Sequence, residues 1–185
     1  MTGCHVGATQ IDRATFTGDA WFDGATFTGD ASFNGVTFTG GARFDGATFT
    51  RVAWFDGVTF TGVGWFSGVT FTGVAWFDGA TFTGGARFDD VTYTGDASFD
   101  RATFTGDAWF DDATFESMPT AGDVWVRVPP PATNTGQDGV WPAGWVVDAS
   151  AAIPRDGWEG SWTKLVPVPV VLAPFPPNWP TNHRR

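Results

Sequence analysis

The side chains that usually carry catalysis or bind metals are few in this chain of 185 residues. Histidine occurs only as His5 and His183, and Cys4 is the single cysteine. Cys4 and His5 could supply half of a metal site, but two adjacent ligands need partners from elsewhere. No HExxH, CxxC, GxSxG or phosphate-loop pattern occurs. The sequence therefore predicts no metal, no cofactor and no catalytic residue, and indicates a protein that is not an enzyme.

Aspartate is abundant, and paired carboxylates can perform acid–base catalysis. However, Asp23, Asp45, Asp89 and Asp111 recur at one outward position of a repeat, which is typical of a solvated face. Residues 11–117 contain 14 Asp and one Glu against five Arg, so they carry the whole net charge of −10. Direct nucleic-acid binding needs a basic surface, so the sequence predicts none here.

Aromatic residues repeat through the chain with spacings of six and five that alternate without a break. The period is 11, as in DAWFDGATFTG, and holds two units of the form A-x-F-x-x plus one extra residue. The same period occurs in helical coiled coils, but frequent Gly with Thr, Phe and Trp between favours strands. The predicted core residues are Phe16, Phe22, Phe27, Phe33, Phe38, Phe44, Phe49, Phe55, Phe60, Phe66, Phe71, Phe77, Phe82, Phe88, Tyr93, Phe99, Phe104, Phe110 and Phe115.

Each unit reads as a short strand that forms one side of a coil. In A-T-F-T-G, Ala and Phe lie two residues apart and point inward, while both Thr point outward. The following Gly is expected to turn a corner with dihedral angles that other residues avoid. Phe then fills the interior of the coil, and Ala leaves room for it.

These units resemble the pentapeptide-repeat family, whose pattern is A-(D/N)-(L/F)-x-x. The resemblance is carried by ATFTG at residues 14–18 and 25–29 and extends over about residues 9–117. It implies an all-β fold: a right-handed quadrilateral β-helix, here of about five coils. Four units with their two extra residues then make one coil, which has a period of 22. It also implies a homodimer through one end of the solenoid. The extra residue departs from the regular family pattern and is Asp19, Asp30, Gly41, Val52, Val63, Val74, Gly85, Asp96 or Asp107.

Outward positions distinguish the coils from one another. At the coil period of 22, one column reads Trp21, Arg43, Trp65, Arg87 and Trp109, and the other reads Ser32, Trp54, Trp76 and Ser98. At a strand spacing of about 4.8 Å the first column predicts stacked cation–π pairs, unless the pattern is drift among duplicated copies.

The second column predicts a contact surface. Val52 and Val74 stack beside Trp54 and Trp76, and rimmed apolar patches rich in Trp mark binding surfaces. These four residues are the candidate protein-binding site. In the alternative interpretation, the Trp rings shield the ladder or the C-terminal segment covers them.

The repeat divides the chain into a lead-in over residues 1–10, the β-helix over residues 11–117, and a Pro- and Trp-rich cap or tail over residues 118–185. Upstream of the repeat only Ile11 continues the pattern. Because the sequence has neither an apolar run of transmembrane length nor a secretory signal, the default expectation is a cytoplasmic protein that does not cross a membrane.

Short strands are predicted in the last segment. They are expected at residues 124–128, 144–148 and 163–166, and extended or polyproline-like structure is expected at residues 129–131 and 167–180. A Pro-rich ligand for another protein in this segment is the alternative to a cap or appendage.

These features favour a rigid interaction scaffold with an unknown protein partner. One alternative follows from the resemblance: some family members mimic DNA with an acidic rod and protect type II topoisomerases such as gyrase. A second alternative is binding to ice through outward Thr-x-Thr arrays, such as Thr59 with Thr61. Thr also favours strands, so the arrays have a simpler explanation.

Overall fold

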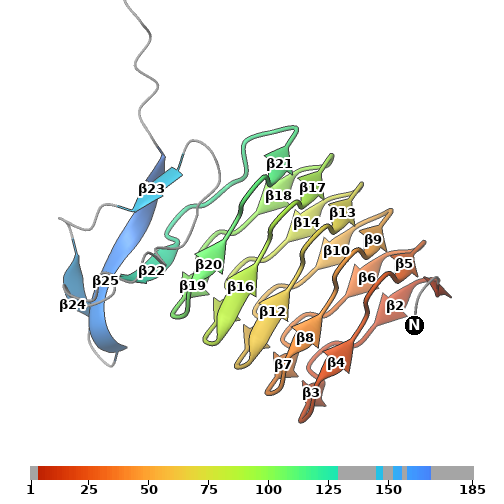
Figure 1. The fold of residues 1–185 in the computed structure, drawn as a ribbon, viewed down its shortest axis with the longest axis horizontal. Coiled ribbons are helices and arrows are strands. Elements are labelled where there is room, and N and C mark those ends of the chain that lie inside the picture. Colours follow the sequence, from red (N-terminus) through yellow and green to blue (C-terminus); the bar gives the residue numbers. More distant parts are fainter. Residues whose placement is uncertain (1–3, 129–144, 148–151, 156–157, 168–185) are drawn as a thin grey trace, which may run out of the picture.

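Short parallel strands joined by tight turns build the protein (Figure 1). The computed structural model describes residues 4–128, 145–147, 152–155 and 158–167. Every element in these residues is a β-strand, which confirms the predicted all-β class.

Four sheets run along the sides of a solenoid. Sheet A contains β1 (His5–Val6), β5 (Thr26–Phe27), β9 (Thr48–Phe49), β13 (Thr70–Phe71), β17 (Thr92–Tyr93) and β21 (Thr114–Phe115). Sheet B contains β2 (Thr9–Gln10), β6 (Ala31–Ser32), β10 (Ala53–Trp54), β14 (Ala75–Trp76) and β18 (Ala97–Ser98). Sheet C begins with β3 (Thr15–Phe16), β7 (Thr37–Phe38), β11 (Thr59–Phe60), β15 (Thr81–Phe82) and β19 (Thr103–Phe104). Sheet D contains β4 (Ala20–Trp21), β8 (Ala42–Arg43), β12 (Val63–Trp65), β16 (Gly85–Arg87) and β20 (Ala108–Trp109).

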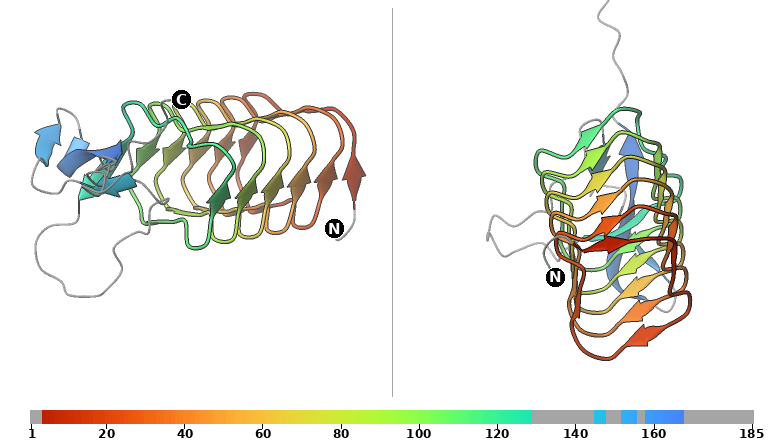
Figure 2. Two further views of the ribbon diagram at one scale, coloured as in Figure 1. Left: turned by 90° about the horizontal axis from the view of Figure 1, so that it is seen from above. Right: turned by 90° about the vertical axis from the view of Figure 1, so that its right-hand side faces the viewer.

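The register confirms the predicted coil period of 22. Each strand from β1 to β17 pairs in parallel with the fourth strand after it, as in Ala53 with Ala75 and Thr59 with Thr81. Successive coils therefore stack in line along one axis (Figure 2). Because the chain visits the sheets in the order C, D, A and B, sheet B lies opposite sheet D.

Columns of stacked rings fill the interior, as predicted. Phe55 lies between Phe33 and Phe77, with ring centroids 4.9 and 4.8 Å away and planes within 4°. Rings of neighbouring columns meet edge to face, as in Phe55 and Phe66 at 5.6 Å and 87°. All predicted core residues are buried except Phe16, Phe22 and Phe115, which are half-buried at the two ends of the columns.

Tyr93 is the one ring in these columns that carries a polar group. Its side chain is 1% exposed, and its hydroxyl has no hydrogen-bond partner among the described residues. An unpaired buried hydroxyl costs about 1–3 kcal/mol. Tyr93→Phe should therefore raise the free energy of unfolding by about that amount, measured by urea denaturation. Unchanged or lower stability would mean that the hydroxyl has a partner after all.

The glycines of the repeat have two different roles. The prediction that the glycine of ATFTG adopts dihedral angles that other residues avoid is wrong. The positive φ angles occur at the other corner, as in Gly24 (62°) and Gly57 (61°), in the turn after Phe and Asp. The glycine of ATFTG is needed for close approach: a Cβ on Gly40 would lie 2.6 Å from the carbonyl carbon of Gly18 in the preceding coil. Neighbouring coils touch backbone to backbone at this corner.

The hydrogen-bonded ladder starts before Ile11. His5 and Val6 pair with Thr26 and Phe27, and β2 pairs with β6. Val6 and Ile11 occupy the positions that Phe takes in later coils and pack partly buried against the core. Part of the segment predicted as a lead-in therefore forms a further turn, so the solenoid has about six turns rather than five.

The last coil is followed by strands that continue sheet C. β22 (Trp125–Val128) pairs in parallel with β19 and antiparallel with β25 (Trp158–Pro167), which in turn pairs with β23 (Trp145–Val147) and β24 (Ile153–Arg155). The three runs predicted as strands here all overlap observed strands. The predicted Pro-rich run at 129–131, and the one at 167–180 beyond its first residue, lie outside the described residues.

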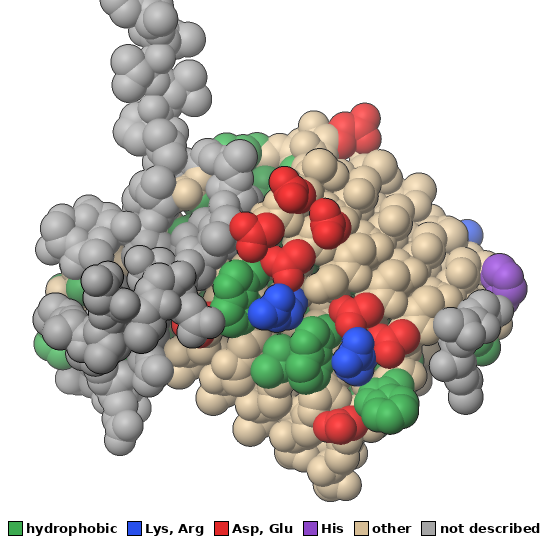
Figure 3. Space-filling model, viewed as in Figure 1, with side chains coloured by type: hydrophobic (Ala, Val, Ile, Leu, Met, Phe, Trp, Pro, Cys, Tyr) green, Lys and Arg blue, Asp and Glu red, His purple; other side chains and the backbone are tan. Residues whose placement is uncertain are grey.

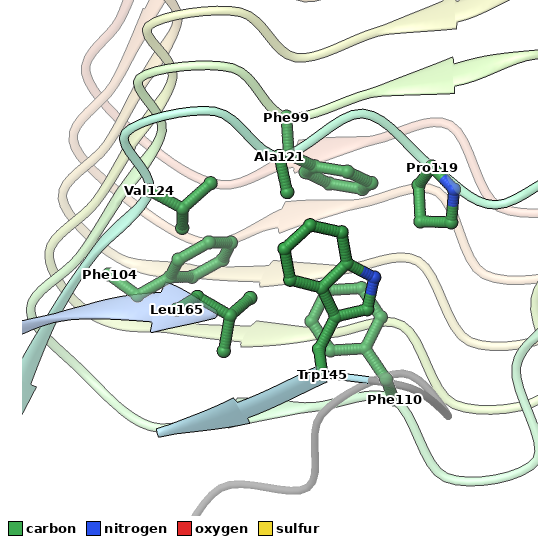
Figure 4. Close-up of a pocket in the computed structure, with 8 residues that line it drawn as sticks. All are labelled: Phe99, Phe104, Phe110, Pro119, Ala121, Val124, Trp145 and Leu165. Atoms are coloured by element: carbon green, nitrogen blue, oxygen red, sulfur yellow. The ribbon is translucent and has the colours of Figure 1, made fainter. Parts of the chain in front are cut away.

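This segment packs on the open end of the aromatic columns. Trp145 and Leu165 face Phe99, Phe104 and Phe110 around a small apolar cavity of about 10 Å³ (Figure 4). The side chain of Leu165 is buried, and its backbone N–H donates to the carbonyl of Val124 at 3.0 Å. The end that would expose Phe rings is therefore covered.

Candidate functional site

The four candidate contact residues lie together on the outer face of sheet B. Trp54 and Trp76 are direct neighbours in paired strands, and each projects outward from between two fully buried residues, such as Ala53 and Phe55. The Trp76 side chain is 41% exposed and Trp54 is half-buried. Val52 and Val74 precede these strands and are half-buried.

A hollow lies on each side of this pair along the rod. The first, of about 520 Å³, is lined by Trp54 together with Asp12, Asp30 and Ser32. The second, of about 300 Å³, is lined by Trp76 together with Asp78, Asp96 and Ser98. The smaller serine side chains leave the space on either side of the Trp ridge.

The order of outward residues along sheet B is the same from either end of the rod. Along sheet B the outward residues are Ser32, Trp54, Trp76 and Ser98, preceded at the corner by Asp30, Val52, Val74 and Asp96. Two hollows that each contain one Trp, two Asp and one Ser therefore flank one apolar centre. The distance between the two hollows is set by the stacking of the coils.

Sheet D carries the predicted alternation of Trp and Arg. The guanidinium carbon of Arg43 lies 5.4 Å from the ring centroid of Trp65, and that of Arg87 lies 4.7 Å from that of Trp109. Hydrophobic and basic side chains alternate along this face in Figure 3. Two of the predicted cation–π pairs are thus confirmed, and in both the Arg stacks on the Trp of the following coil.

Gly41, at a corner of sheet D, makes room for the ring of Trp65. A Cβ on Gly41 would lie 2.5 Å from the Trp65 ring. Arg43 also pairs with Asp23 and Asp45, at 3.2 and 2.7 Å. Trp65 therefore packs against Gly41 and against an Arg side chain that two carboxylates hold in place. Trp21, at the N-terminal end of the column, is 67% exposed.

The recurring aspartates do more than form a solvated face, which corrects the prediction. The Oδ1 atoms of Asp23 and Asp45 each accept a hydrogen bond from the backbone N–H of the residue at the same position in the next coil, whereas the buried Oδ1 of Asp89 has no partner among the described residues. On sheet D, the backbone of Asp45 donates to Asp23 at 3.2 Å and that of Ser67 donates to Asp45 at 3.0 Å. Asn34 serves in the equivalent column beside sheet B, where the backbone of Asp56 donates to its Oδ1 at 3.1 Å. An amide oxygen can replace the carboxylate.

Partial burial makes several of these carboxyl groups weaker acids than usual. Desolvation raises the pKa of Asp45, Asp56 and Asp89 above the ordinary 3.8, despite the hydrogen bonds from backbone that lower it. A hydrogen bond from Ser32 lowers the pKa of Asp12.

These pKa values predict that mild acid stabilises the fold. Below neutral pH, the folded protein binds protons at Asp45, Asp56 and Asp89 before the unfolded chain does, so the free energy of unfolding increases as the pH falls towards 3.8. The thermal midpoint should therefore rise as the pH is lowered from 7 towards 3.8. Replacing all three by Asn keeps the acceptors and should flatten this dependence. A midpoint that falls steadily over this range would contradict the prediction.

The threonine arrays also have a place in the fold. Thr59 and its copies stack in register along sheet C, and the equivalent column from Thr26 stacks along sheet A, so the predicted arrays lie on opposite sides. In several units the hydroxyl of the second Thr forms a hydrogen bond with the backbone of the preceding coil. The hydroxyls of Thr39 and Thr50 each donate at 3.0 Å to a Phe carbonyl there.

The described residues contain no group of three or more His, Cys, Asp or Glu arranged to hold a metal ion. His183 lies outside them. Nor do they contain a helix with the length and apolarity needed to span a membrane.

The comparisons with known proteins agree with this architecture. A family model described as pentapeptide repeats (9 copies) matches residues 2–48, 44–92 and 77–118. No curated protein and no solved structure matches the chain. The matched segments together span well over half of the chain and coincide with the stacked coils. The chain therefore belongs to the pentapeptide-repeat family.

Proposed function

We propose that this chain is a non-enzymatic scaffold that binds a protein partner through sheet B, with Val52, Trp54, Val74 and Trp76 as its contact surface. A ladder closed on four sides is stiff, so it presents these side chains at fixed spacing. Little ordering entropy is then lost when a partner binds.

One observation carries the proposal. Among the described residues, the indole side chains of Trp54 and Trp76 take part in no ring stack, cation–π contact or hydrogen bond, unlike those of Trp65 and Trp109, which Arg side chains cover. A large exposed indole without an internal role is typical of a binding hot spot.

The two alternative functions have weaker support. Part of the acidity that a DNA mimic needs is supplied by aspartates that also join neighbouring coils, as Asp23 and Asp45 do. The threonines that ice binding needs likewise include several that bond within the ladder. Neither array requires a ligand to explain it.

The proposal predicts that the two Trp rings matter for binding more than for folding. Trp54→Ala combined with Trp76→Ala should cost less than about 1 kcal/mol of stability, because both rings lie outside the core. The same variant should lose partner capture or self-association. Capture is measured by affinity purification from the native host, and self-association by sedimentation velocity.

Trp21→Ala supplies the control. Trp21 is more exposed than either residue but lies on the opposite sheet, so its loss should leave binding intact. If the double variant unfolds, or if Trp21→Ala abolishes binding equally, sheet B is not the contact surface.

A further inference from the structure

We propose that sheet B binds a basic, extended segment of a partner protein, with one cationic side chain in each hollow and apolar side chains over the Trp pair between them. This inference rests on the proposed function, because it names the chemistry of the partner that the same surface receives.

The residues that line the two hollows favour a cationic ligand. Each combines one Trp ring, two Asp carboxylates and a Ser hydroxyl, and no Lys or Arg among the described residues lines either hollow. A guanidinium or ammonium group gains from the face of an indole and forms its strongest hydrogen bonds with carboxylates. The two hollows therefore share a preference for cations.

The Arg side chains near the hollows do not cancel this preference for cations. Arg51 pairs with Asp30 at 3.1 Å beside the first hollow, and Arg13 and Arg101 act at longer range on Asp12 and Asp56. Asp78 and Asp96 at the second hollow form no ion pair within the described part of the chain. We expect the second hollow to bind its cation more tightly.

The spacing of the hollows sets the spacing of the basic residues. Ser32 and Ser98 lie three coils apart, which is about 15 Å at the usual distance between strands. An extended chain covers this distance in about four to five residues. The partner segment should therefore carry two basic residues four or five positions apart, with aliphatic residues between them.

The direction of the segment follows from the same geometry. The hollows are aligned along the rod, so the segment crosses the strands of sheet B on their outer face. It does not add a strand to a sheet edge. Side chains, rather than backbone hydrogen bonds, supply its affinity.

The test uses the full chain and a fluorescein-labelled peptide, GRAVAVRG, in fluorescence anisotropy at low salt. The expected result is saturable binding that weakens as salt is added. GEAVAVEG, which reverses both charges, should not bind. GRRAVAVG, which places both charges together, should bind at least about 5-fold more weakly, since it reaches only one hollow.

Two variants assign the binding to sheet B. Asp12→Asn with Asp78→Asn removes one charge from each hollow and keeps the acceptor that joins the coils, as Asn34 does naturally. Affinity should fall at least about 10-fold. Asp107→Asn with Asp111→Asn makes the same charge change on the opposite face and should alter affinity less than about 2-fold.

Other outcomes overturn the inference. Equal losses in both Asn variants would mean attraction to the net charge alone. Another outcome is that no peptide binds although the variant with both Trp54 and Trp76 replaced by Ala still loses its partner. In that case sheet B is the contact surface, but its partner is not a basic extended segment. A wild-type dimer that this variant dissociates makes a second copy the occupant. Binding that appears only after residues 168–185 are deleted makes that segment the occupant.

Discussion

Phe55→Ala should lower the free energy of unfolding by about 3–5 kcal/mol. Phe55 is fully buried, with Phe33 stacked on one side and Phe77 on the other. Coils above and below fix these rings at the strand spacing, so the structure can collapse little around the missing ring. Much of the cavity should remain, which places the cost at the upper end for such a substitution. Urea denaturation monitored by circular dichroism measures it.

Thr59→Ala is the matched control. Thr59 lies in the next strand but points outward, and its loss should cost less than about 1 kcal/mol. Comparable effects at the two positions would contradict the assignment of inward and outward faces.

Gly84→Ala should destabilise the protein by about 3 kcal/mol, the upper end of the cost of overpacking. Its added Cβ would lie 2.5 Å from the carbonyl of Gly62 in the preceding coil. The obstacle is backbone, which cannot rotate away, so two coils would have to separate at this corner. This column holds glycine in every coil: Gly18, Gly40, Gly62, Gly84 and Gly106.

Gly18→Ala distinguishes this explanation from a simple preference for glycine in turns. Gly18 has the same place in the repeat and an ordinary φ, yet an added Cβ meets nothing within 4 Å. Its substitution should be neutral or slightly stabilising. If both variants are destabilised equally, conformational freedom rather than close approach explains the glycines.

The repeat made the coil, the strands and the inward Phe columns predictable. Phe is large and recurs at fixed spacing, so the sequence alone indicates which side of each strand faces the core. The first turn was harder to recognise, because Val6 and Ile11 hold positions that are aromatic elsewhere and their strands, β1 and β2, lack the repeated pattern.

The columns of the surface were predictable only in part. Spacing placed Trp54 beside Trp76, and Arg43 beside Trp65, because both pairs follow from a coil period of 22. The inter-coil hydrogen bonds of Asp23 and Asn34 depend on where a side-chain oxygen meets the next backbone, which composition does not reveal. The two glycine roles likewise require knowledge of φ angles and of how closely the coils approach.

The alternation of the four sheets constrains how such a chain can change in length. Every half-coil buries the same kind of core side chains, so gain or loss of one half-coil would leave the interior filled. However, all later strands would advance by two sheets, and Trp76 would move from sheet B to sheet D while Trp54 stayed. Duplication of a single half-coil would therefore preserve folding and scramble the surface. Only duplication of whole coils would lengthen the rod and keep each face intact.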